Sequence, residues 1–379
     1  MRVAYNATTL AAPYGGVSVA VEAAARALAR ELGPELVMFV PSNYAEPEHR
    51  RDAGATGEPT LVRAPVTGRN RAARIAWEQL FLPAAALAHG AEVLHAPAYV
   101  LPLRWRGPAV VTVYDLLTLT HPEWCRRGNV AHFRRALPAT LRRAERIVVP
   151  SEATAEEIRQ HTDADPARLR RIPLGVEERF RPASPDAIAG TRRQWDLPER
   201  YVLIVGNLEP KKNVAGMARM FGRLVEEIPH QLVIAGREAW GDPRAWRVAV
   251  EDLPPGRVNL LGYVPRMDLP DLYSGAELLL HLSWHEGFGL PPLEAMACGT
   301  AAAVSNRGAL PEIAGPGALV LDPEDEAGAA RAIGEVLTNE TARRELAARG
   351  QTHVAQYTWA AHARGLLQVY QEALDERAG

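Results

Sequence analysis

Short apolar runs alternate with longer amphipathic stretches along the whole chain. Runs rich in Val, Ile and Leu are typical of strands buried on both faces of a parallel sheet, and the stretches between them suit covering helices. We expect strands in the first half at 3–6, 36–40, 93–96, 110–114 and 147–150. The second half restarts the rhythm, with strands expected at 201–205, 232–235, 258–261, 278–282, 301–304 and 319–321. The pattern therefore predicts an α/β fold of two tandem doubly wound, Rossmann-like domains.

The chain length agrees with two domains, because 379 residues exceed what one ordinary core accommodates. We expect a first domain over 1–175, a second over 176–357, and a C-terminal helix in 358–379 that packs back on the first domain. Residues 171–198 are polar and Pro-containing, and are interpreted as the linker. In open α/β sheets ligands bind beyond the carboxyl ends of the strands, so we expect the two domains to face a cleft.

The composition is that of a folded protein, with 47% hydrophobic and 23% charged residues. Cys125 and Cys298 lie far apart in the sequence and have no metal-ligand spacing, which argues against a disulfide framework and a zinc site. The N-terminus enters a strand-like segment directly, and no apolar run approaches the roughly 20 residues of a spanning helix. We therefore expect a cytoplasmic protein.

The charge is unevenly distributed. Residues 1–175 carry 22 Arg against 17 Asp and Glu, a net charge of +5, whereas residues 176–379 carry a net charge of −7. Three arginine pairs in the basic half, at 126–127, 134–135 and 142–143, would form one drifting stripe on a helix. The stripe is either a solvated helix face or a surface for an anionic acceptor or lipid, which would give peripheral contact with the inner membrane face. We expect no nucleic-acid partner.

Only two of the 43 basic residues are lysines, Lys211 and Lys212. A lysine retained against so strong a preference for arginine indicates a position where a guanidinium does not serve. The compact ammonium on a flexible stem suits a point contact with a phosphate oxygen. The alternative is the chance survival of a surface pair.

The segment 283–299 follows a buried strand and begins a helix at two adjacent prolines. Proline is favoured in the first turn of a helix, so the Gly287–Phe288–Gly289 turn presents backbone amides at a helix N-terminus, where a diphosphate or sugar hydroxyls can bind. Glu286 precedes the helix and Glu294 lies about one turn into it, so each can hold hydroxyls of one ligand, Glu286 on a sugar and Glu294 on a ribose. The alternative is a plain helix start with Glu294 solvated.

These motifs together resemble the donor site of retaining glycosyltransferases of family 4, which have the GT-B fold. The resemblance rests on Glu286 and Glu294 around Gly-Phe-Gly-Leu-Pro-Pro-Leu, and on the segment 206–213, Gly-Asn-Leu-Glu-Pro-Lys-Lys-Asn. It extends over nearly the whole chain, because Gly15-Gly16, Val149-Pro-Ser, Ile172-Pro-Leu-Gly-Val and Leu261-Gly-Tyr-Val also stand where that family has its loops. The resemblance implies an acceptor-binding first domain and a second domain that binds a nucleotide-sugar donor.

The family pattern assigns roles to individual residues. Lys212 would bind the donor diphosphate and stabilise the leaving charge, while Glu286 and Glu294 would hold the donor sugar and the ribose. The remaining donor contacts would come from glycines that admit the ligand, from amides of the helix-start turn and from residues flanking the base: Gly15, Gly16, Gly287, Phe288, Gly289, Leu290, Tyr263 and Val264.

Two departures from the family pattern concern the phosphates and the donor sugar. Asn207 stands where many members have Arg or Thr, and Arg237 is a candidate replacement for that phosphate contact or an ordinary surface residue. Tyr114 stands where the family often has a histidine, and Asp115 is a candidate catalytic residue there, with His121 a further alternative.

The resemblance implies transfer with retention, in which the departing phosphate takes the proton of the acceptor hydroxyl and no covalent nucleophile is needed. It implies neither a metal nor a cofactor, only a nucleotide-diphosphate sugar as co-substrate. The variant around Lys212 resembles bacterial mannosyltransferases of surface-polysaccharide assembly, which favours GDP-mannose as donor and a saccharide or lipid-linked saccharide as acceptor. The alternatives are a nucleotide-sugar epimerase of the same fold and a non-catalytic sugar-binding homologue.

Overall fold

The computed structural model describes residues 1–10, 15–45, 57–67 and 70–378. The chain divides into two compact units, one formed by Met1–Gly175 with Thr358–Gly379 and the other by Val176–Tyr357. These boundaries fall at the residues expected from the sequence.

The first unit contains a seven-stranded sheet in the order β3-β2-β1-β4-β5-β6-β7, with every pairing parallel. Its strands are β1 (Val3–Asn6), β2 (Leu36–Pro41), β3 (Thr60–Ala64), β4 (Val93–Ala96), β5 (Ala109–Thr112), β6 (Arg146–Val149) and β7 (Leu169–Arg171). The expected strands are present, and the two edge strands β3 and β7 are additional. Edge strands need fewer apolar residues because they pair on one side only, and both carry arginine.

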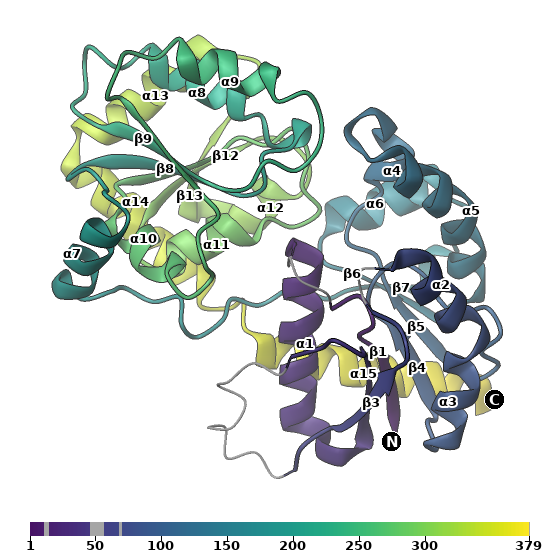
Figure 1. The fold of residues 1–379 in the computed structure, drawn as a ribbon. Helices are drawn as coiled ribbons and strands as arrows, with labels where there is room; N and C mark the ends of the chain where they lie inside the picture. Colours follow the sequence, from purple (N-terminus) through teal and green to yellow (C-terminus); the bar gives the residue numbers. More distant parts are fainter. Residues whose placement is uncertain (11–14, 46–56, 68–69, 379) are drawn as a thin grey trace. The chain divides into compact units, whose positions relative to one another are not determined.

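Two helical layers cover this sheet. Its helices are α1 (Gly16–Leu32), α2 (Arg71–Leu80), α3 (Leu82–Ala88), α4 (Leu117–Thr120), α5 (Arg127–Arg143), α6 (Glu152–His161) and α15 (Trp359–Ala378). Helices α1 and α15 pack side by side on one face of the sheet, and α2, α3, α5 and α6 lie over the other (Figure 1). As the sequence predicts, Ser151 caps α6, where its hydroxyl accepts a hydrogen bond from the Thr154 amide at 3.1 Å.

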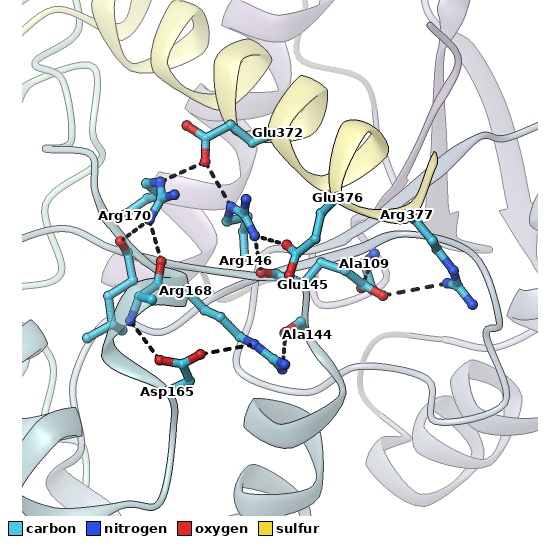
Figure 2. A network of polar contacts seen from close by, with 12 residues as sticks. Ala109, Ala144, Glu145, Arg146, Asp165, Arg168, Arg170, Glu372, Glu376 and Arg377 are labelled. Atoms are coloured by element: carbon cyan, nitrogen blue, oxygen red, sulfur yellow. Dashed lines mark hydrogen bonds and ion pairs between the residues drawn. The ribbon is translucent and has the colours of Figure 1, made fainter. Parts of the chain in front are cut away.

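Ion pairs fasten the C-terminal helix α15 to the edge of the first sheet. Glu372 accepts hydrogen bonds from Arg146 Nε at 2.8 Å and from Arg170 Nε at 2.7 Å, and Arg146 also contacts Glu376 (Figure 2). The two arginines lie at the start of β6 and in β7. The helix that follows the second unit in sequence therefore belongs to the first unit.

The second unit contains a six-stranded sheet in the order β10-β9-β8-β11-β12-β13, again with parallel pairings. Its strands are β8 (Tyr201–Val205), β9 (Gln231–Ala235), β10 (Val258–Gly262), β11 (Leu278–His281), β12 (Ala301–Ser305) and β13 (Ala318–Leu321). All six expected strands are present. Strands β8, β11 and β12 have no exposed residue, as expected for strands covered on both faces.

Helices again form a layer on each face of the second sheet. They are α7 (Pro185–Gln194), α8 (Val214–Gly222), α9 (Arg244–Glu251), α10 (Leu269–Gly275), α11 (Leu290–Ala297), α12 (Leu310–Ala314), α13 (Glu326–Thr338) and α14 (Glu340–Val354). One face carries α8, α9 and α13, and the other carries α10, α11, α12 and α14 (Figure 1). Both units are thus doubly wound, which confirms the fold predicted from the sequence.

The expected linker over 171–198 is wrong for most of its length. Arg171 ends β7, and residues from Val176 onward belong to the second unit. Within that stretch, Pro185 begins α7, whose N-terminus is capped by Ser184 accepting from the Ala187 amide at 3.2 Å. The polar composition is that of the amphipathic helix α7, which packs on α10. A capping serine and a proline in the first turn are common at the start of such a helix.

The arginine pairs of the basic half lie on or next to α5, and five of the six arginines are exposed, as a solvated helix face requires: Arg126, Arg127, Arg134, Arg135 and Arg142. Arg143 instead bridges Glu145, at 2.9 Å, and the carbonyl oxygens of Trp105 and Gly107. Among the helices of the described residues, none is long and apolar enough to cross a membrane.

Candidate donor-binding site

The two lysines lie in a short 3-10 helix, Pro210–Lys212, that follows β8. Gly206 leaves the strand with φ of 143°, and a Cβ built on it would lie 3.6 Å from Lys212 Cε. The carbonyl oxygen of Lys211 accepts a hydrogen bond from the Trp284 amide at 2.8 Å. The segment is therefore attached to the loop that follows β11, the loop in which the sequence places Glu286.

Asn213 fixes the end of this lysine segment. Its φ is 54°, in the left-handed region, and its side-chain amide donates to the Leu282 carbonyl oxygen at 3.0 Å. Asparagine is one of the few residues that adopt this conformation readily. The backbone thus turns directly after Lys212 and starts α8 at Val214.

Both lysines contact the carboxylate of Glu286. Lys212 Nζ contacts Glu286 Oε1, and Lys211 Nζ lies 3.4 Å from Oε2. The Ser283 hydroxyl donates to Oε1 at 3.1 Å, and His281 Nε2 lies 3.1 Å from the same oxygen. Residues more than seventy positions apart in sequence therefore meet at the carboxyl ends of β8 and β11.

The local charges keep Glu286 ionised. Burial alone would raise its pKa, but the ammonium groups of Lys211 and Lys212 and the hydrogen bond from His281 hold the pKa well below its ordinary value. Burial lowers the pKa of His281, and the nearby lysine charges add to that effect. The site thus holds one carboxylate between two cations, with a neutral imidazole beside it.

The turn after Glu286 forms the N-terminus of α11. Gly289 is the N-cap residue with φ of 102°, and a Cβ there would lie 2.6 Å from Leu310 Cδ2, so only glycine fits. The Glu286 carbonyl oxygen accepts from the Ala309 amide at 2.9 Å. Gly287 and Phe288 are buried, and Leu290 is the first residue of the helix. As the sequence predicts, a glycine turn leads into a helix whose first turn contains two prolines.

Glu294 lies in α11 with 2% of its surface exposed, so it is not a solvated helix residue. Its Oε1 accepts from Arg266 Nη2 at 2.7 Å and its Oε2 accepts from the Tyr273 hydroxyl at 3.1 Å. Arg266 also donates from Nε to Glu177 at 2.6 Å. Glu294 is therefore a buried carboxylate with a defined orientation.

Three glycines lie at or directly after the ends of the neighbouring strands β8, β9 and β10. A Cβ on Gly236 would lie 1.8 Å from the Gly206 carbonyl oxygen, and the Gly236 amide donates to the Gly262 carbonyl oxygen at 2.7 Å. The loops after β8 and β9 run so close together here that side chains are excluded. This edge of the sheet is where open α/β folds bind ligands.

The remaining predicted donor contacts in this unit lie on those loops. Asn207 and Arg237 are exposed, and Tyr263 is 52% exposed, whereas Val264 is buried. The guanidinium carbon of Arg237 lies 3.8 Å from the centre of the Tyr263 ring. Arg237 is thus stacked on the residue expected to flank the base, and does not lie among the described contacts of Lys212.

The other predicted residues belong to the first unit. Gly15 is the N-cap residue of α1 and Gly16 its first residue, with no atom within 4 Å of a built Cβ at either; Pro13 and Tyr14, which precede them, lie outside the described residues. Asp115 follows β5, and its Oδ1 accepts from the Leu117 amide at 3.3 Å.

Tyr114 fills the position of the family histidine with a buried ring that packs edge-on against Tyr99 at 5.8 Å. His121 stacks on Trp124 at 4.2 Å. No group of three or more His, Cys, Asp or Glu side chains in the described ranges is arranged to hold a metal ion.

Sequence reasoning gave no role to three groups of this site. In the sequence, Asn213 is only the last residue of the 206–213 motif, and His281 is the last residue of an apolar strand. Arg266 gave no signal at all, because it precedes an unremarkable helix and its partners lie 89 and 28 residues away. Such contacts are set by tertiary packing and have no local pattern.

Comparison with known proteins agrees with this geometry. Residues 14–180 match the family model described as Glycosyltransferase Family 4, and residues 191–353 match the model described as Glycosyl transferases group 1. The chain is 32% identical over 270 residues to O-antigen chain mannosyltransferase B of Escherichia coli, covering 70% of this chain and 71% of that protein. The chain therefore belongs to family 4 of the glycosyltransferases.

Two further comparisons extend the result. Serotype-specific mannosyltransferase WbdA of E. coli is 31% identical over 258 residues, and the chain spans 32% of its length. The structure of Anabaena Alr3699/HepE in complex with UDP-glucose superimposes with a TM-score of 0.74 at 18% identity, covering 98% of this chain and 99% of that one. The fold is the GT-B type that the resemblance implied.

Proposed function

We propose that this chain is a retaining glycosyltransferase that moves a sugar, with mannose favoured, from a nucleotide-diphosphate donor to a saccharide or lipid-linked saccharide. One observation carries the proposal: the only two lysines converge on Glu286 directly before the helix N-terminus of α11. Two ammonium groups and a helix dipole at one strand edge are suited to a diphosphate.

In this proposal the second unit binds the donor. Lys212 exchanges its contact with Glu286 for a phosphate oxygen and stabilises the charge that develops as the nucleotide leaves. Glu286 then accepts hydrogen bonds from the donor sugar, and amides of Gly287 to Leu290 meet sugar and phosphate. Glu294 takes the ribose hydroxyls.

The base would lie against Tyr263 and Val264. Arg237, stacked on Tyr263, would border the base and would not serve as a phosphate contact. In the first unit, Asp115 is the candidate catalytic residue, and Gly15 and Gly16 are candidate donor contacts. The reaction requires neither a metal nor a cofactor in this scheme, because cationic side chains and amides supply the charge stabilisation.

The names of two relatives, both mannosyltransferases, support mannose as the transferred sugar, and GDP-mannose as the donor is proposed from the sequence resemblance alone. The structural neighbour is a complex with UDP-glucose, so it supports a nucleotide sugar as the class of ligand. At 18% identity it gives no argument for a particular base or sugar. The epimerase and the non-catalytic sugar-binding protein remain the alternatives, and each predicts different products when the chain is incubated with a sugar nucleotide.

The test is calorimetric titration of GDP, UDP and ADP into the wild-type chain and Lys212→Ala. We expect GDP to bind in the micromolar range, Lys212→Ala to lose at least about tenfold in affinity, and the exposed control Arg331→Ala on α13 to bind as wild type. Equal binding by wild type and Lys212→Ala would remove the site assignment. Incubation with GDP-mannose then separates the classes: a transferase releases GDP as mannose passes to water or to an added saccharide acceptor, an epimerase releases an altered sugar nucleotide, and a binding protein releases neither.

A further inference from the structure

Arg266 forms a bridge between two carboxylates in the second unit. Its Nε donates to Glu177 Oε1 at 2.6 Å and its Nη2 donates to Glu294 Oε1 at 2.7 Å. The Phe180 ring lies 4.8 Å from the guanidinium carbon, so the plane of the fork is held by an aromatic contact as well. The side chain is 28% exposed. This residue is therefore fixed in position by three separate contacts.

The bridge leaves Glu294 with a definite remaining capacity. An ionised carboxylate offers about four lone-pair sites. Arg266 uses one of them on Oε1 and the Tyr273 hydroxyl uses one on Oε2, at 3.1 Å. The remaining capacity, about one site on each oxygen, matches a vicinal pair of hydroxyl donors such as the 2′- and 3′-hydroxyls of a ribose.

Burial makes the arginine necessary for that arrangement. The Glu294 side chain is 3% exposed, and an ionised carboxylate so removed from water is costly unless it is paired. Tyr273 donates a hydrogen bond but brings no charge. Arg266 supplies the charge, and its second arm on Glu177 prevents the fork from rotating about the Glu294 contact.

We propose that Arg266 is a positioning residue that orients the buried Glu294 carboxylate to accept both hydroxyls of the donor ribose, so that Arg266 determines selectivity for ribonucleotides. This inference rests on the proposed function, which places the donor ribose at Glu294. Arg266 acts through Glu294 and need not touch the donor.

The chain offers a matched control in Arg179. Its Nη2 lies 3.0 Å from Oε2 of the same Glu177, and its exposure of 24% is close to that of Arg266. Its contacts with Glu177 and Met267 do not reach Glu294. Arg179→Gln removes a cation from the cluster and leaves the Glu294 contact intact.

The experiment is titration of GDP and 2′-deoxy-GDP, and of UDP and 2′-deoxy-UDP, into the wild type, Arg266→Gln, Arg266→Lys, Arg179→Gln and Tyr273→Phe. Because a hydrogen bond to a charged group contributes substantially, we expect wild type to bind the ribonucleotide at least about tenfold tighter than its deoxy counterpart. Arg266→Gln reduces this ratio to within about twofold, and Arg266→Lys gives an intermediate ratio because lysine keeps the charge but lacks the fork.

A variant at Tyr273 keeps the inference testable if Arg266→Gln folds poorly. Tyr273→Phe removes only the hydroxyl on Oε2, and we expect it to reduce the ratio as well, whereas Arg179→Gln keeps the wild-type ratio. An unchanged ratio in folded Arg266→Gln, or an equal loss in Arg179→Gln, overturns the positioning role while the proposed function stands. A wild type that binds no nucleotide removes the proposed function and this inference with it.

Discussion

The side-chain amide of Asn213 donates a hydrogen bond to the carbonyl oxygen of Leu282 at 3.0 Å, and so joins the lysine segment to the end of β11. A Cβ built on Gly216 would lie 2.4 Å from Asn213 Oδ1, so the glycine leaves room for this side chain. The lysines and the glutamate of the proposed donor site follow different strands. Asn213 connects their supporting backbones, together with the hydrogen bond from the Trp284 amide to the Lys211 carbonyl oxygen.

Asn213→Ala should therefore destabilise the second unit and weaken nucleotide binding. The left-handed conformation costs alanine roughly 1–2 kcal/mol, and the lost donor to the buried Leu282 carbonyl costs about 1–3 kcal/mol. Urea unfolding followed by circular dichroism measures the first effect and titration with GDP the second. Asn213→Gly relieves the backbone strain but lacks the amide, so it should lie between wild type and alanine; equal stability of all three would contradict this account.

Glu286→Gln should separate recognition of the sugar from recognition of the phosphates. The substitution removes the negative charge that Lys211 and Lys212 share, so the lysines are freer to bind a diphosphate. We expect the affinity for GDP to stay the same or rise, while the rate of transfer from the sugar nucleotide falls by roughly a hundredfold, because the charged acceptor for the sugar hydroxyl is lost.

The measurement is the pair of GDP affinity and kcat for Glu286→Gln beside Lys212→Ala. We expect the two variants to behave oppositely towards GDP, since one loses the anion and the other loses the cation. A drop in GDP affinity in Glu286→Gln as large as in Lys212→Ala would mean that the glutamate only holds the lysines in place.

The sequence predicts those strands of both sheets that have strong apolar runs. The runs are apolar because these strands are covered on both faces. The sequence missed β3 and β7, since a short edge strand such as Thr60–Ala64 mixes polar and apolar residues and has neither a continuous apolar run nor a regular alternation. It also read residues 171–198 as a linker, because polarity and prolines are common to linkers and to amphipathic helices such as α7. Periodicity alone does not separate the two.

The same distinction holds for the site. Glu286, Lys212 and the glycine turn have local motifs, and each follows or precedes a strand or helix that the sequence itself defines. Arg266 and Asn213 act through partners far away in the chain, so their roles appear only when the segment after β8 meets the end of β11 and the segment before α10 meets α11. A sequence motif therefore identifies candidate ligand-binding residues more easily than it identifies the residues that hold them in place.

Glu372→Gln should weaken the docking of α15 on the first unit. Its carboxylate accepts from both Arg146 and Arg170, and these contacts hold the pKa of Glu372 below its ordinary value, against the effect of burial. Because the side chain is 38% exposed, the loss should be modest, about 0.5–1 kcal/mol at low salt, and smaller at high salt.

Hydrogen exchange of the α15 amides at low and high salt measures this docking. The control is Asp375→Asn on the same helix, whose carboxylate accepts a hydrogen bond from the Gln371 side chain at 2.8 Å. We expect the control to exchange as wild type. Faster exchange in Asp375→Asn than in Glu372→Gln would place the docking energy elsewhere on the helix.

Two buried histidines should make the first unit sensitive to acid. His95 lies between the Tyr370 hydroxyl, 2.7 Å from Nδ1, and the Thr112 hydroxyl, 2.8 Å from Nε2, and burial lowers its pKa to about 3. His362 donates from Nδ1 to the Pro173 carbonyl oxygen at 2.8 Å, and burial lowers its pKa to about 4. Both connect α15 with the rest of the unit, and both are neutral in the folded chain.

The direction of the pH dependence follows from these shifts. Below the ordinary histidine pKa of about 6.5 the unfolded chain binds protons that the folded chain excludes, so stability is fully present above pH 6.5 and falls as the pH is lowered towards 4. Each histidine should contribute a slope of roughly 1.4 kcal/mol per pH unit in that range.

Urea unfolding between pH 7 and 4.5 measures the slope. His362→Gln should reduce the slope by the contribution of one histidine, roughly 1.4 kcal/mol per pH unit. His161→Gln should leave the slope unchanged, because His161 is an exposed residue of α6. An identical slope in His362→Gln and wild type would show that this histidine is already protonated, or free to become so, in the folded chain.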